Sequence, residues 1–154
     1  AEAQLLLADV SLLRGDLSAA RSALTQAAPA LFAEYPPGHS ERAGVLLIET
    51  RILLAENDAA AALARLDSIW PQLRDWENGT SDDSQRQDAQ VARALRAQAL
   101  AMTGDCSAAT RMLADRQPAL LLNRREIWQR AVAVVARTCE ASASLSPTPV
   151  GAVS

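Results

Sequence analysis

The sequence predicts an all-α domain built from three helix–turn–helix units and a closing helix, and two observations carry that prediction. Nearly half of the 154 residues are apolar, yet only 3 % are aromatic, and alanine is abundant. Alanine has the highest helix propensity and lets helices approach closely, so this composition favours packed helices over a sheet. The second observation is a short turn pattern that recurs three times along the chain.

The recurring pattern has Gly or Asn, then Asp, and then Ala-Ala four and five residues after the Gly or Asn. It occupies residues 14–20, 56–62 and 103–109. Gly and Asn tolerate the left-handed backbone conformation that ends a helix, and the Asp that follows can cap the next helix. The last alanine of the pattern falls where two helices cross closely. The pattern therefore predicts turns between helices at Gly15, Asn57 and Gly104.

Small and apolar residues extend the match on both sides of each turn, at helical spacing. Seven residues before the turn stand Ala8, Thr50 and Ala97, and nine residues after it stand Leu24, Leu66 and Leu113. The three units are expected at about residues 1–35, 40–76 and 86–117.

Two joints separate the units, and a further helix follows them. The segment 35–43 contains Pro-Pro-Gly-His and closes one helix, with Ser40 expected to cap the next one. The segment 78–84 is polar and is expected to form the second joint. A capping helix is expected over 123–140, which closes a repeat domain at 1–140, and the tail 141–154 is expected to be disordered. The inner face of the capping helix is expected to carry Ile127, Trp128, Ala131, Val134 and Val135.

The first unit resembles a tetratricopeptide repeat. The positions that carry the resemblance are Ala8, Gly15, Ala20, Leu24 and Ala27. The other two units depart from it, since Asn57 replaces Gly and Arg116 stands where the first unit has Ala27. The units are also longer than the standard repeat of about 34 residues. Long repeats with a Pro-Pro-Gly-His joint resemble those of bacterial signalling proteins, including the C-terminal sensor regions of serine/threonine protein kinases.

This resemblance implies a right-handed α-solenoid whose first helices line a concave groove. The implied lining consists of Glu2, Leu5, Asp9, Leu12, Gly44, Leu47, Arg51, Leu54, Val91, Ala94, Gln98, Ala101 and Met102. It is mostly apolar, with one polar row of Asp9, Arg51 and Gln98, and such a surface suits a helix or an extended peptide. The alternative is that the groove is filled by a neighbouring segment of the full-length protein or by a second copy, as in a homodimer.

Cys106 and Cys139 are expected at the start of one helix and near the end of the following helix, which should lie side by side. A disulfide between them would close a loop of about 33 residues and would indicate an oxidising compartment. Two buried free cysteines, as in a cytosolic helical protein, are the alternative. The spacing excludes a CxxC metal or redox motif.

The remaining residues that can carry chemistry are better explained as structural. His39 is the only histidine and lies in a turn, and Asp82 and Asp83 lie in a polar joint. Trp70, Trp76 and Trp128 are expected to fill gaps between helices. We expect no catalytic residue, metal site or cofactor. The net charge of −3, with interspersed signs, argues against a nucleic-acid partner, and the absence of a long apolar run argues against membrane insertion.

The function expected from the resemblance is a protein- or peptide-binding module without enzymatic activity. Because the chain begins without Met inside a helical pattern, it is expected to be part of a longer protein. It would be a sensory or interaction domain of a bacterial signalling protein such as a membrane receptor kinase, facing the periplasm or another extracytoplasmic space. The alternatives are a scaffold in envelope or secretion-system assembly, or a cytoplasmic regulator.

Overall fold

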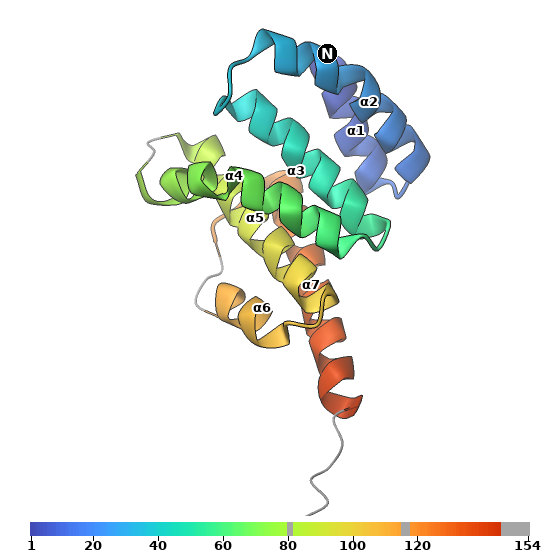
Figure 1. Cartoon of the computed structure of the whole chain (residues 1–154), viewed down its shortest axis with the longest axis vertical. Coiled ribbons are helices and arrows are strands. Elements are labelled where there is room, and N and C mark those ends of the chain that lie inside the picture. Colours follow the sequence, from blue (N-terminus) through green and yellow to red (C-terminus); the bar gives the residue numbers. More distant parts are fainter. Residues whose placement is uncertain (80–81, 115–117, 146–154) are drawn as a thin grey trace, which may run out of the picture.

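A computed structural model describes residues 1–79, 82–114 and 118–145, and every regular element among them is a helix (Figure 1). The prediction of an all-α protein is confirmed. The helices are α1 (Glu2–Leu13), α2 (Leu17–Glu34), α3 (Ser40–Ala55), α4 (Ala59–Gly79), α5 (Asp83–Met102), α6 (Cys106–Leu113) and α7 (Leu122–Leu145).

The three expected turns are present, and each has the expected backbone conformation. The φ angles of Gly15, Asn57 and Gly104 are 76°, 61° and 98°. The Asp that follows each of them caps the next helix, because its Oδ1 atom accepts a hydrogen bond from a backbone N–H three residues on. The three bonds run from Ala19 to Asp16 at 3.0 Å, from Ala61 to Asp58 at 3.2 Å and from Ala108 to Asp105 at 3.0 Å.

Small residues lie where paired helices cross. In all three units the residue seven positions before the turn residue and the residue five positions after it are completely buried. These residues are Ala8, Ala20, Thr50, Ala62, Ala97 and Ala109, each with 0 % exposure. Thr50 satisfies its buried hydroxyl by donating to the carbonyl of Leu46 at 2.8 Å. A larger side chain at these positions would separate the helices, so the recurrence of small residues follows from packing.

Successive helices pack on one another from α1 to α6. α1 lies against α2, α3 against α4 and α5 against α6, while α2 and α4 also contact the helices that follow them. Figure 1 shows the pairs stacked from the blue end of the chain toward the orange α6. α7 packs mainly against α5 and to a lesser extent against α6, and its last turns project beyond the stack.

The helix boundaries differ from those expected at the start of α3 and at the end of α7, and α4 and α5 also extend into the expected joint 78–84, to Gly79 and from Asp83. His39, not Ser40, caps α3, because His39 has extended backbone angles and its Nδ1 atom accepts the N–H of Glu41 at 3.2 Å. The His39 ring also stacks on Tyr35 at 4.3 Å, which fixes the joint before α3.

The second difference lies at the end of the chain, where α7 continues past the expected end at Glu140 to Leu145. Residues 141–145 contain neither Gly nor Pro, so nothing in them stops a helix. The remainder of the expected tail, residues 146–154, lies outside the described residues, as does Arg116 of the third unit.

Candidate functional site

α7 lies along the face that α1, α3 and α5 share, which is the face expected to form an open groove. Leu47, Leu54 and Ala94 of the expected lining are buried, and they belong to one apolar cluster with Ile127 and Ala131 of α7. A segment of the chain itself therefore covers much of this surface. The first turns of α7 lie beside the start of α5, and Cys139 farther along α7 is bonded to Cys106, which follows the end of α5, so the two helices run parallel.

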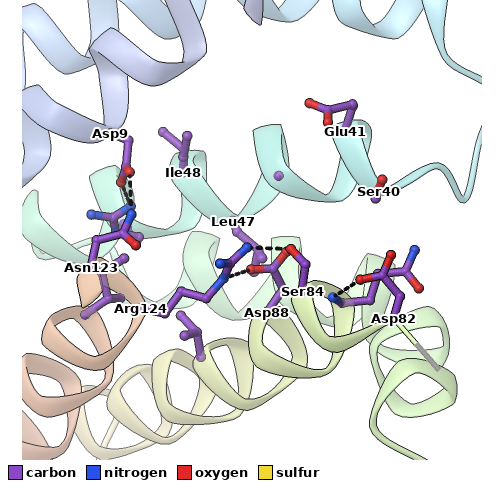
Figure 2. Close-up of a pocket in the computed structure, with 15 residues that line it drawn as sticks. Asp9, Ser40, Glu41, Leu47, Ile48, Asp82, Ser84, Asp88, Asn123 and Arg124 are labelled. Atoms are coloured by element: carbon purple, nitrogen blue, oxygen red, sulfur yellow. Dashed lines mark hydrogen bonds and ion pairs between the residues drawn. The ribbon is translucent and has the colours of Figure 1, made fainter. Parts of the chain in front are cut away.

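α7 leaves two cavities between itself and the other three helices, one beyond the other along its length. The first has a volume of about 310 Å³ and many polar groups on its wall, and we call it the polar cavity (Figure 2). The second has a volume of about 160 Å³ and a mostly aliphatic wall, and we call it the apolar cavity. Arg51 and Ile127 line both cavities, so the two meet at these side chains. We call the two cavities together the channel.

An ion pair and an amide line the polar cavity, and Arg51 of that ion pair also lines the apolar cavity. The Arg51 guanidinium bonds to Oδ1 of Asp9, and both side chains are largely buried, at 12 % and 16 % exposure. Asn123 at the start of α7 donates from Nδ2 to the other oxygen of Asp9 at 3.1 Å (Figure 2). Asp9 therefore connects α1 to α3 and to α7 at the same point.

A second ion pair lies at the α5 side of the polar cavity. Arg124 donates from Nε to Asp88 Oδ1 at 2.8 Å and from Nη2 to Ser84 Oγ at 2.7 Å (Figure 2). Burial raises the pKa of Asp88, and the bond and charge of Arg124 offset part of that rise. The two side chains are about one-quarter exposed, so water weakens the attraction between their charges only in part.

The polar cavity has an excess of negative charge. Its wall contains the carboxylates of Asp9, Glu41, Asp82 and Asp88 but only the two arginines, Arg51 and Arg124, and each arginine already binds one of the four carboxylates. Figure 2 shows Glu41 and Asp82 on the side of the cavity away from Asp9. A cationic group entering the cavity would be favoured electrostatically.

The apolar cavity offers a different environment. Its wall is formed by Leu12, Leu13, Leu54, Ala55, Leu95, Ala131 and Val134, in addition to Ile127 and the polar side chains Arg51, Gln98 and Arg130. Arg130 donates to the carbonyl of Leu13 at 3.4 Å and to Glu126 at 2.5 Å, so its charge is already paired. The surface available to a ligand here is therefore mainly aliphatic.

The structure brings only part of the expected groove lining together. Of the expected polar row, Asp9 and Arg51 meet in the ion pair, whereas Gln98 lies in the apolar cavity, where its amide contacts the Met102 sulfur at 3.8 Å. Leu5 lies outside the channel, in a shallow depression between α1 and α3. Met102 is half-buried and lines neither cavity.

Sequence reasoning missed the polar side chains that α7 contributes. Asn123, Arg124 and Arg130 all face the other helices, although the capping helix was expected to contribute an apolar inner face only. The buried members of that expected face are found, since Ile127, Ala131 and Val135 are at most 9 % exposed. The cluster Asn123-Arg124-Arg125 at the helix start was the available signal.

A disulfide fastens the other end of α7. The structure joins Cys106, at the start of α6, to Cys139, and the Cα atoms are 5.6 Å apart. Ala97, Ala109 and Val135 are buried beside the two cysteines. α7 is thus held at its start by Asn123 and Arg124 and near its end by a covalent bond.

The other residues considered for chemistry have structural partners. Asp82 caps α5 by accepting from the Gln85 N–H at 3.1 Å. Trp76 is buried, and Trp70 lies under the Arg96 guanidinium at 4.8 Å from its ring centre. Within residues 1–79, 82–114 and 118–145, the acidic, His and Cys side chains form no group of three that could hold a metal. No helix in the same ranges combines the length and apolar character that a membrane span requires.

Comparison of the chain with protein-family models, with curated proteins and with solved structures found no match.

Proposed function

We propose that this chain is a protein- or peptide-binding module of the tetratricopeptide kind, with the channel as its binding site. The recurring turn favours this class, because each instance combines a positive φ angle, an Asp cap and fully buried small residues. Such stacks use their inner face for binding, and the channel lies on the face shared by α1, α3 and α5.

The channel is the observation that carries the proposal, and its two cavities define the ligand. The polar cavity, with its excess of carboxylates, suits the ammonium or guanidinium group of a Lys or Arg side chain. The apolar cavity suits one aliphatic side chain of modest size. A peptide with a cationic residue close to an aliphatic residue would place one side chain in each.

The disulfide supports a location for this binding module. Structural disulfides persist in the periplasm and outside the cell and are rare in the bacterial cytoplasm. The Cys106–Cys139 bond is therefore in keeping with an extracytoplasmic sensory or interaction domain of a larger bacterial signalling protein, such as a membrane receptor kinase.

Selection from a random peptide library tests the binding site. We expect bound peptides to be enriched in a Lys or Arg near an aliphatic residue, with affinity that falls as salt rises. Ile127→Trp would fill the point where the two cavities meet, so the selected peptides should lose at least about tenfold in affinity. Ala133→Trp is the control, because it introduces the same large side chain on the exposed side of α7; it should bind the peptides like the wild type.

Two results would contradict the proposal. One is a library selection that enriches no class of sequence. The other is equal binding by the wild type and Ile127→Trp, with both folded by circular dichroism, which would place the peptide outside the channel.

A further inference from the structure

The first residue of α7 has a strained backbone. Leu122 has a φ angle of 44°, and in the described chain Asn57 is the only other residue besides glycines with a positive φ. In this conformation the Cβ atom of a bulky residue comes too close to the following carbonyl oxygen, so Gly or Asn normally occupies it. The Leu122 side chain is 88 % exposed, so its burial does not offset the backbone strain.

The strained residue belongs to a short segment that has no apolar anchor of its own. We call this segment, residues 121–126, the lid. Leu121 and Leu122 are its only apolar side chains, and both are exposed. The residues on either side of the lid, Leu120 and Ile127, are buried and belong to one apolar cluster. The lid therefore lies between two points that are anchored in the core.

Hydrogen bonds hold the lid against its neighbours. Asn123 bonds to α1 and Arg124 bonds to α5 (Figure 2), and the Leu121 N–H donates to Gln87 Oε1 at 3.0 Å. Water can replace each of these partners when the lid moves outward, so each bond stabilises the closed position only modestly. Asn123 and Arg124 also line the polar cavity, so outward movement of the lid would open that cavity to solvent.

We propose that the lid is the entrance to the polar cavity and that the strained Leu122 backbone favours its opening. When the lid unwinds, Leu122 leaves the left-handed conformation, so the release of strain lowers the free energy needed for opening. Ile127 keeps the rest of α7 in place, and a peptide reaches the carboxylates without displacing the whole helix. The role as an entrance rests on the proposed function, whereas the opening itself is a property of the chain alone.

Amide hydrogen exchange at Arg124 measures the opening without any ligand, because this N–H donates to the Leu121 carbonyl at 3.1 Å. Leu122→Gly removes the strain, so the lid should open less often and exchange at Arg124 should slow by about threefold. Leu121→Gly is the matched control, since Leu121 is also exposed, at 61 %, but its φ angle is not positive. Glycine there only adds freedom to the open lid, so exchange should become faster by about threefold.

The opposite signs of the two effects decide this part of the proposal. Exchange that changes in the same direction in both glycine variants, or in neither of them, overturns the role of Leu122.

The association rate of a peptide from the library selection, one with a Lys beside an aliphatic residue, tests the entrance. A peptide that enters through the lid associates in proportion to the open fraction, so Leu122→Gly should slow its association by about threefold. Leu121→Gly should speed association by about the same factor. If peptides lose affinity for Ile127→Trp but associate equally fast with the wild type and both glycine variants, the channel binds them and the lid is not the entrance. A selection that yields no peptide contradicts the proposed function and the entrance with it.

Discussion

Single residues with positive φ angles set the path of the chain between paired helices. Gly15, Asn57 and Gly104 each end a helix in the left-handed conformation, and the Asp that follows begins the next helix. Because glycine lacks Cβ, it adopts this conformation without the steric cost that other residues meet. These turns decide where each pair of helices folds back.

Gly15→Ala should lower the free energy of unfolding by about 1 kcal/mol. A Cβ atom at Gly15 would meet no heavy atom within 4 Å, so the cost comes from the backbone angle and not from a clash. Gly79→Ala is the control, because a Cβ there also meets nothing but its φ angle is not positive; it should be neutral or slightly stabilising. Equal effects of the two substitutions in urea unfolding would contradict this explanation.

Local residue patterns allowed the turns and the buried alanines to be predicted, whereas contacts between distant residues could not be. Gly15 and Ala20 act on neighbouring helices, so their spacing is visible in the sequence. The Asn123–Asp9 bond joins residues 114 positions apart, and no pattern links them. The cap at His39 was missed because Ser40 is the commoner capping residue and the ring nitrogen of His39 can also accept a hydrogen bond.

At the scale of the elements, the Arg124–Asp88 pair holds the start of α7 against α5. Arg124→Gln should raise the pKa of Asp88 further, because burial then acts without the offsetting guanidinium. When folding raises the pKa of a carboxyl group, the folded protein loses stability as the pH rises through that pKa. The substitution should therefore cost about 1–2 kcal/mol near pH 7 and less near pH 4.

Arg125→Gln is the control for that change. Arg125 is exposed and donates to the carbonyl of Leu120 at 3.2 Å, away from Asp88. Its effect on unfolding should be small and independent of pH. Carboxyl ¹³C titration by NMR measures the pKa of Asp88 directly, and an unchanged value in Arg124→Gln would show that the pair does not control this group.

The disulfide is expected to stabilise the same element from its other end. It closes a loop of 33 residues between Cys106 and Cys139, so the chain-entropy estimate of its contribution is about 3–4 kcal/mol. Cys106→Ser together with Cys139→Ser should lower the free energy of unfolding by about that amount. Unfolding of the reduced wild type should match the double variant. If oxidised and reduced protein unfold at the same urea concentration, the bond does not constrain α7.

At the scale of the whole molecule, the position of α7 turns an expected open groove into a channel. The spacing of Ile127, Ala131 and Val135 predicted a buried face on this helix but not the surface it meets. α7 could lie at the end of the stack or across its inner face with the same apolar residues. In the structure the first half of α7 lies across the inner face, where Asn123 reaches α1 and Ile127 lines both cavities. The part of α7 near Cys139 lies at the end of the stack.

This division predicts that the two halves of α7 open independently. Asn123→Ala removes the bond to Asp9, which should cost about 1 kcal/mol locally and speed amide hydrogen exchange roughly fivefold in the first turns of α7. Exchange near Cys139 should not change, since the disulfide holds that end to α6. Gln129→Ala, an exposed position on the same helix, should leave both halves unchanged. If Asn123→Ala instead speeds exchange uniformly along α7, the helix opens as one unit, and a peptide would enter the channel only by displacing it entirely.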